Sequence, residues 1–124
     1  MRAKGLMGYR IGHRPVAPSV YLITVGGELD MKASPKLRRT IDHALENEIS
    51  LLVVDLTDAT FIDSTGIGAL VAALKRLTTE GGSLEIACSE PNLLRIFELT
   101  GLDRLLSIHP SRREALGAFA GASA

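Results

Sequence analysis

The chain has 124 residues, a length that suits a single domain. It is 46% hydrophobic but only 4% aromatic and lacks tryptophan, so its core must be built from aliphatic side chains. The formal net charge of zero argues against nucleic acid as the main partner, and no stretch approaches the roughly 20 apolar residues that span a bilayer.

The first nineteen residues differ in charge from the rest of the chain. Their charged side chains are all basic: Arg2, Lys4, Arg10 and Arg14. We interpret residues 1–19 as a basic N-terminal leader, in which residues 6–11 are a candidate first strand. The leader could otherwise be a mobile tail or a partner contact. It lacks the apolar run of a secretory signal, so we expect a cytoplasmic protein.

The next elements follow from hydrophobic patterning and from helix-start signals. Residues 20–25 form an apolar, β-branched run that stops at a glycine pair, which is typical of a strand. Ser34 and Pro35 predict a helix in which Ser34 is the cap and Pro35 takes the first helical position. This helix should end near Asn47. Residues 51–56 are almost continuously apolar, which indicates a central strand covered on both faces.

The remaining predicted elements are a helix over residues 65–79, a strand over residues 84–88, a helix from Pro91 to Gly101, a strand over residues 105–108 and a helix from Ser111 to Phe119. Ser111 and Glu114 have the spacing of a capping box, which indicates where the last helix begins. Alternating strands and helices predict an α/β domain with a largely parallel sheet. We place that domain at residues 20–119, followed by a flexible tail at residues 120–124.

Cysteine and histidine give little sign of chemistry. Cys88 is the only cysteine and lies in an apolar run, so we interpret it as a buried small hydrophobe. The histidines His13, His43 and His109 are scattered without metal-ligand spacing. The sequence therefore predicts no metal site and no cofactor.

The segment Asp63-Ser64-Thr65-Gly66-Ile67-Gly68 stands out because it lies where a buried strand turns into a helix. Such a turn lies at the carboxyl end of the strands, where α/β proteins place their sites. The start of a helix also offers unpaired N–H groups and the positive end of the helix dipole, which favour an anion. We expect Ser64 to be exposed there.

Two interpretations of Ser64 follow from its position. It could simply cap the helix, with the glycines serving packing. It could instead accept a phosphate, since a serine on an exposed helix start can enter a kinase active site. Phosphorylation would add roughly −1.5 to −2 charges beside Asp63 and repel a partner that had docked on a neutral hydroxyl.

Nucleotide-binding motifs fit this segment poorly. Gly66 and Gly68 match the first two glycines of G-x-G-x-x-G, but Val71 stands where the third should be. No glycine precedes the helix either. A P-loop is excluded because no Gly-Lys-Ser/Thr occurs.

A hydrolase elbow, G-x-S-x-G, is an equally imperfect match. Gly66 fits the second glycine, but Ile62 replaces the first. Ser64, Asp103 and His109 follow the hydrolase order of nucleophile, acid and base. A three-residue order is easily matched by chance, and the chain is short for that fold.

Four motifs in the same order resemble the STAS domain family, and more narrowly its bacterial anti-sigma factor antagonists: Gly27-Glu28-Leu29-Asp30, Phe61-Ile62-Asp63-Ser64-Thr65-Gly66-Ile67-Gly68, Gly81-Gly82-Ser83-Leu84 and Leu99-Thr100-Gly101-Leu102. The resemblance covers about residues 20–119. It implies an α/β STAS fold, in which a mixed but mostly parallel sheet of four to five strands packs with about four helices.

The resemblance also implies a function. Antagonists of this family bind an anti-sigma factor that is itself a serine kinase, and so free a sigma factor for transcription. The kinase inactivates the antagonist by phosphorylation, and a metal-dependent, PP2C-type serine phosphatase reverses it. The antagonist is a substrate and not an enzyme, with no direct contact to nucleic acid or membrane. The family leans towards monomers.

Matching motif positions assigns roles to individual residues. Ser64 corresponds to the phosphorylated serine, and Thr65 is the second candidate. The expected partner-binding residues are Asp30, Asp63, Ser64, Thr65, Gly66 and Gly68. Asp30 has a plainer interpretation as an acid that closes a turn before a helix. An alternative function within the family is a non-switching scaffold or ligand-binding module of a stress-signalling or transport complex.

Overall fold

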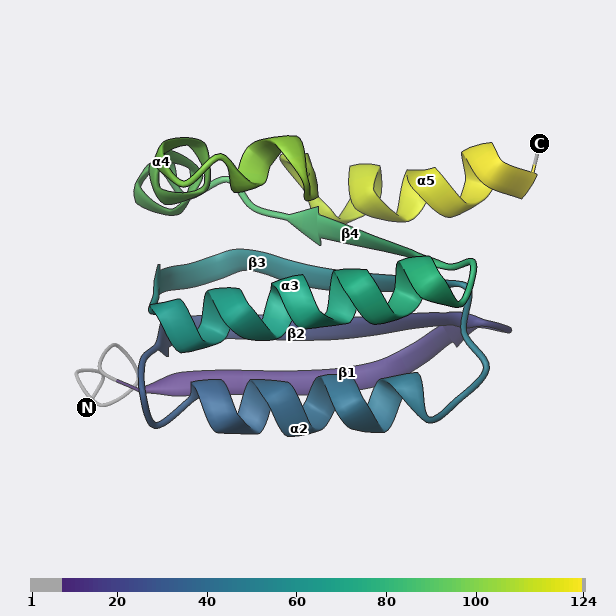
Figure 1. Ribbon diagram of the computed structural model, residues 1–124, viewed down its shortest axis with the longest axis horizontal. Coiled ribbons are helices and arrows are strands. Elements are labelled where there is room, and N and C mark those ends of the chain that lie inside the picture. The colour runs from purple at the N-terminus through teal and green to yellow at the C-terminus, as the bar shows by residue number, and fades with distance from the viewer. Residues whose placement is uncertain (1–7, 124) are drawn as a thin grey trace.

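A computed structural model describes residues 8–123 of the chain. In chain order the elements are β1 (Tyr9–Ala17), β2 (Val20–Leu29), α2 (Ser34–Leu45), β3 (Leu51–Ile62), α3 (Ser64–Thr79), β4 (Ser83–Ala87), α4 (Pro91–Leu99), the short 3-10 helix η1 (Leu102–Arg104), β5 (Ser107–His109) and α5 (Arg112–Ser123). After β1 the strands alternate with helices, as the sequence predicts for an α/β domain (Figure 1).

The strands form one sheet in which neighbours in space are also neighbours in sequence, in the order β1-β2-β3-β4-β5. β1 runs antiparallel to β2, and the other pairs are parallel. β3 is buried throughout its first six residues because it lies at the centre of the sheet. The predicted sheet, mixed and mostly parallel, is therefore confirmed.

One face of the sheet is covered by α2, α3 and α4 and carries the larger apolar core (Figure 1). Leu37, Leu70 and Phe97, one from each helix, are fully buried against it. A buried side chain of this size contributes about 1.5–3 kcal/mol. Cys88 also lies in this core, and burial raises the pKa of its thiol. Its interpretation as a buried small hydrophobe is confirmed.

The opposite face of the sheet is covered by α5 and combines a smaller apolar cluster with two contacts between an acidic and a basic side chain. Arg112 Nε lies 2.7 Å from Asp55 Oδ2, and His109 Nε2 lies 2.7 Å from Glu85 Oε1. Burial alone would raise the pKa of Asp55. Hydrogen bonds from the Thr57 hydroxyl and backbone N–H, together with Arg112, outweigh burial and lower it.

The first strand differs from the prediction for residues 6–11. Leu6 and Met7 lie outside the described residues, and β1 continues to Ala17, paired with β2 along its length. Pro15 is tolerated because β1 is an edge strand, and no strand within residues 8–123 pairs with its outer side. Pairing with β2 therefore extends the strand beyond the predicted residues, through Gly12 and Pro15.

The glycine pair does not end the second strand, contrary to the prediction. β2 runs on to Leu29, and its register against β3 shifts between Gly27 and Glu28. Gly27 has a φ of 82°, and a side chain there would overlap the carbonyl oxygen of Gly8. Gly27 therefore allows a bulge within the strand.

Helix ends agree with the sequence at some positions and not at others. Ser34 is not the cap of α2, because Ala33 takes that position and Ser34 is a buried first residue. Ser111 does cap α5, since its Oγ accepts a hydrogen bond from the Glu114 N–H at 3.1 Å. α5 extends to Ser123, beyond the predicted end at Phe119.

Candidate functional site

The turn from β3 into α3 is built around the carboxylate of Asp63. Asp63 has extended backbone angles and caps α3 by accepting a hydrogen bond from the Gly66 N–H at 2.9 Å. The same oxygen accepts a bond from the hydroxyl of Ser34, at 2.8 Å. The Asp63 N–H donates to the carbonyl of Leu29 at the end of β2. Asp63 therefore joins β2, α2 and α3, and its carboxylate holds the turn in place.

Ser64 is the first residue of α3, and Asp63 is its cap. The interpretation of Ser64 as the cap is wrong, because Asp63 occupies the cap position. Aspartate is as favourable at a helix cap as serine is. Ser64 and Thr65 are both exposed. Within the described part of the chain, the Ser64 hydroxyl forms no hydrogen bond, so it is free to meet a partner or an enzyme.

Asp30 lies at the same end of the sheet but serves its own turn. Its Oδ1 accepts hydrogen bonds from the N–H groups of Lys32 and Ala33, at 3.0 and 3.2 Å. The interpretation as a turn acid before a helix is confirmed. Leu29 of β2 pairs with Ile62 of β3. Asp30 and Asp63, which follow these two residues, therefore lie next to the carboxyl ends of neighbouring strands.

The two glycines of the motif are in different surroundings. A side chain at Gly66 would come within 2.8 Å of Ile62 Cγ1 and 3.2 Å of Ser34 Oγ, so Gly66 permits the close approach of α3. A side chain at Gly68 would meet nothing within 4 Å. Packing within this chain therefore explains Gly66 and leaves Gly68 unexplained.

Two exposed apolar side chains follow or end the strands at this end of the sheet, and the sequence analysis assigned neither of them a role. Met31, directly after Asp30, is 80% exposed, and Phe61, at the end of β3, is 45% exposed. Phe61 pairs with Glu28 on β2, so it lies at the same carboxyl end of the strands. Met31 follows the last residue of one motif and Phe61 begins another, which was the available signal. We define the Ser64 surface as Asp30, Met31, Phe61, Ser64, Thr65 and Gly68.

The residues of the hydrolase pattern are not joined to one another by hydrogen bonds. His109 bonds to Glu85 and lies 3.2 Å from the hydroxyl of Ser107. Asp103 lines a groove beside α4 and β5. Among the described residues no hydrogen bond links Ser64 to either side chain, so the geometry gives the serine no general base.

Neither a metal cluster nor a membrane span is found where the structure is described. No group of three His, Cys, Asp or Glu side chains in residues 8–123 is arranged to hold a metal ion. None of the described helices combines the length and apolar character needed to cross a bilayer.

Comparisons with known proteins agree with this architecture. The sequence model of the STAS domain family matches residues 14–115. The anti-sigma-B factor antagonist of Listeria monocytogenes is 35% identical over 86 residues, 69% of this chain and 75% of that protein. The protein of the same name in Bacillus subtilis is 33% identical over 86 residues, 69% of this chain and 78% of that protein.

A solved structure shows the same fold. The crystal structure of an anti-sigma factor antagonist from Mycobacterium paratuberculosis matches with a TM-score of 0.81 and 29% identity, over 90% of this chain and 93% of that one. The chain therefore belongs to the STAS domain family. The family resemblance and the fold class expected from the sequence motifs are both confirmed.

Proposed function

We propose that this protein is an anti-sigma factor antagonist that docks through the Ser64 surface and is switched off by phosphorylation of Ser64. The observation that carries the proposal is an exposed serine hydroxyl, without a partner among the described residues, on a helix start that Asp63 holds in place. The relatives named anti-sigma-B factor antagonists support the docking role.

Docking would use both the hydroxyls and the apolar side chains of this surface. Met31 and Phe61 supply apolar area of the kind that anchors protein interfaces, while Ser64 and Thr65 supply neutral hydroxyls. Gly68 leaves the helix surface open, so that a partner backbone can approach it closely. Such an approach would explain a glycine that packing within the chain does not require.

A phosphate on Ser64 would be held by this protein and would repel its partner. The Ser64 and Thr65 N–H groups lie in the first turn of α3, where no helical carbonyl is available, and the helix dipole favours an anion there. The added charge of roughly −1.5 to −2 would stand beside Asp63 and disfavour a docked protein by repulsion and desolvation. The charge alone suffices, without a change of fold.

The proposed partners are two enzymes that act on this protein. An anti-sigma factor with serine-kinase activity would bind the unmodified form, release its sigma factor and phosphorylate Ser64. A PP2C-type serine phosphatase would restore the active form. The protein itself would catalyse no reaction and would act on transcription only through these contacts.

Intact-mass spectrometry tests the modification. The full chain is incubated with ATP and, in turn, each serine-kinase anti-sigma factor of the same organism. We expect one added phosphate, mapped to Ser64, which is lost in Ser64→Ala and kept in Thr65→Ala. A phosphate found only on Thr65 would make Thr65, and not Ser64, the phosphorylated residue. No phosphate with any kinase would favour the non-switching module of a larger complex.

Affinity for the anti-sigma partner tests the switch. Ser64→Asp should weaken binding several-fold or more, because it puts charge into the interface, while Ser64→Ala should still bind. Ser83→Asp is a matched control, since this exposed serine begins β4 at the opposite end of the strands. Equal affinities for Ser64→Asp and Ser64→Ala would rule out switching by charge.

A further inference from the structure

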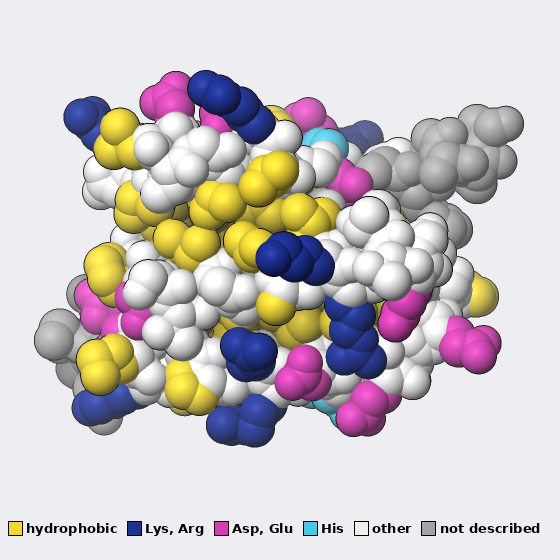
Figure 2. Space-filling model, viewed as in Figure 1, with side chains coloured by type: hydrophobic (Ala, Val, Ile, Leu, Met, Phe, Trp, Pro, Cys, Tyr) yellow, Lys and Arg dark blue, Asp and Glu magenta, His cyan; other side chains and the backbone are white. Residues whose placement is uncertain are grey.

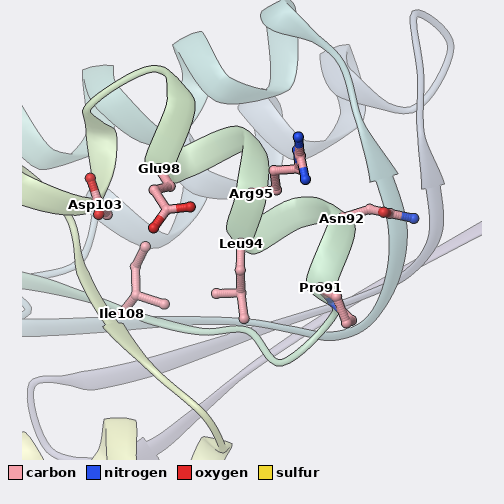
Figure 3. Close-up of a pocket in the computed structure, with 7 residues that line it drawn as sticks. All are labelled: Pro91, Asn92, Leu94, Arg95, Glu98, Asp103 and Ile108. Carbon is pink, nitrogen blue, oxygen red and sulfur yellow. The ribbon is translucent and has the colours of Figure 1, made fainter.

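A groove on another part of the molecule shares no residue with the Ser64 surface. It lies between α4, η1 and β5 and has a volume of about 580 Å³ (Figure 3). Pockets that hold small ligands measure about 300–1,000 Å³. The groove is therefore large enough to take side chains of another protein.

Apolar side chains gather in this region. Leu94 of α4 and Ile108 of β5 line the groove from its two sides, and Leu94 is 37% exposed. Leu99 and Leu105, also from the α4–β5 segment, are 73% and 63% exposed. Three of the six exposed large hydrophobic side chains of the described residues thus lie in this short stretch. Hydrophobic side chains are also exposed between α3 and α4 (Figure 2). Exposed apolar area of this kind favours an interaction surface in this part of the fold.

Carboxylates border the apolar lining of the groove. Glu98 projects from α4 towards the space above Ile108, and Asp103 reaches the same space from η1 (Figure 3). Arg95 points away from them. In the part of the chain that the structure describes, neither Glu98 nor Asp103 is in an ion pair. The groove therefore favours a positive charge on an aliphatic stem, as in lysine or arginine.

The groove also borders the outer edge of the sheet. β5 is the last strand, and the Cys88 N–H donates to the carbonyl of His109 at 2.8 Å. In a parallel pair, backbone groups of successive residues point alternately to the two sides. The N–H and C=O of Ile108 therefore point away from β4, towards any strand that is added at this edge.

We propose that this groove docks an extended segment of a protein partner that carries a lysine or arginine between apolar residues. The segment pairs with the backbone of Ile108. Its basic side chain lays the aliphatic stem along Leu94 and Ile108 and places the charge between Glu98 and Asp103. Because Ser64 is not among the residues that line the groove, this docking is independent of the phosphorylation of Ser64.

The test uses a capped heptapeptide of alternating valine and lysine, titrated into the full ¹⁵N-labelled chain and followed by NMR. We expect saturable shifts of the Leu94, Glu98, Asp103 and Ile108 amides. The same peptide with glutamate in place of lysine should give no such shifts. Ser64→Asp should bind the lysine peptide as the unaltered chain does.

Variants separate the groove from general charge attraction. The double change Glu98→Gln and Asp103→Asn, which keeps side-chain size, should weaken peptide binding at least about tenfold. Leu94→Ser should weaken it as well. Glu48→Lys, at an exposed acid between α2 and β3, is the control and should bind as before.

Four outcomes would overturn the proposal. The groove amides could stay unshifted at millimolar peptide, or they could shift equally with the glutamate peptide. They could also shift with chain concentration alone, together with a dimer in sedimentation, which would make a second copy the occupant. A folded double variant that binds as tightly as the unaltered chain would remove the role of the carboxylates.

Discussion

The two faces of the sheet are covered in different ways. The face under α2, α3 and α4 is covered by a continuous apolar core, mostly aliphatic, in which Phe97 and Leu70 are wholly buried. The face under α5 has a smaller apolar cluster and places Asp55 and Glu85 among its buried residues, with Arg112 and His109 as their partners. Apolar burial stabilises the first face, and its contribution does not change with pH. Part of the stability of the second face depends on ionised groups and therefore on pH.

The two faces therefore contribute differently: the first mainly stabilises the fold, and the second also fixes the position of a helix. A large apolar core stabilises without directional contacts. A buried carboxylate needs partners in fixed places, since an unpaired charge inside a protein is costly. Asp55 therefore fixes where α5 begins, because Arg112 is the first residue of that helix.

The largest effect is expected from truncation of the first face. Phe97→Ala should cost about 3–5 kcal/mol in the free energy of unfolding, because it leaves a cavity in the main core. Urea unfolding at neutral pH measures the cost. Leu99→Ala is the control on the same helix. It lies at an exposed position and should change stability by about 0.5 kcal/mol or less. A similar cost for both variants would mean that α4 does not pack as described.

A smaller and pH-dependent effect is expected on the second face. Arg112→Ala should cost about 1–3 kcal/mol at pH 7, since Asp55 then loses its charged partner while Thr57 still donates to it. The Arg112 side chain is 44% exposed, so solvent screening favours the lower part of this range.

The pH dependence follows from the lowered pKa of Asp55. A carboxyl with a lower pKa in the folded state stabilises above its unfolded pKa, near 3.9, and loses this contribution as pH falls. The cost of Arg112→Ala should therefore shrink between pH 7 and pH 3, while that of Phe97→Ala should not. Urea unfolding at both pH values measures this, with the neighbouring Arg113→Ala as control. Equal costs of Arg112→Ala at the two pH values would contradict the assignment.

The last pair of variants concerns the end of the first face that meets the Ser64 surface, and it includes the smallest effect expected on stability. Gly66→Ala should cost about 1–3 kcal/mol, because the added carbon meets Ile62. Gly68→Ala should leave the chain as stable or stabilise it by up to about 1 kcal/mol, since alanine favours helix. Under the proposed function it should nevertheless weaken anti-sigma binding. Thermal unfolding and binding to the anti-sigma partner, measured on both variants, test this pair. A destabilised Gly68→Ala would contradict the open surroundings of Gly68.

Sequence patterns predicted most elements because those elements depend on local signals. The apolar run of β3 and the capping box of α5 depend on periodicity and on side chains a few residues apart. β1 was missed in large part because its order comes from pairing with β2, which outweighs the effect of Gly12 and Pro15. The strand predicted at residues 6–11 overlaps β1 only at residues 9–11, and the sequence of the leader did not indicate how far β1 extends or which strand it pairs with.

The site shows the same division. The motif predicted that Ser64 would lie exposed at a helix start, because the change from strand to helix pattern is a local property. It could not show that Asp63 is the cap, or that the capping oxygen also bonds Ser34, which lies 29 residues away in sequence. The partner-binding roles of Asp30, Asp63, Ser64, Thr65, Gly66 and Gly68 stay predictions.

The sequence by itself determined the alternation of strands and helices, the aliphatic core and the place of the Ser64 turn, because each depends on residues close together in the chain. Only the tertiary structure decided that Arg112 pairs with Asp55, that Ser34 supports Asp63, and that α4, η1 and β5 enclose a groove. These contacts join residues far apart in the chain, and their geometry follows from how the helices pack on the sheet.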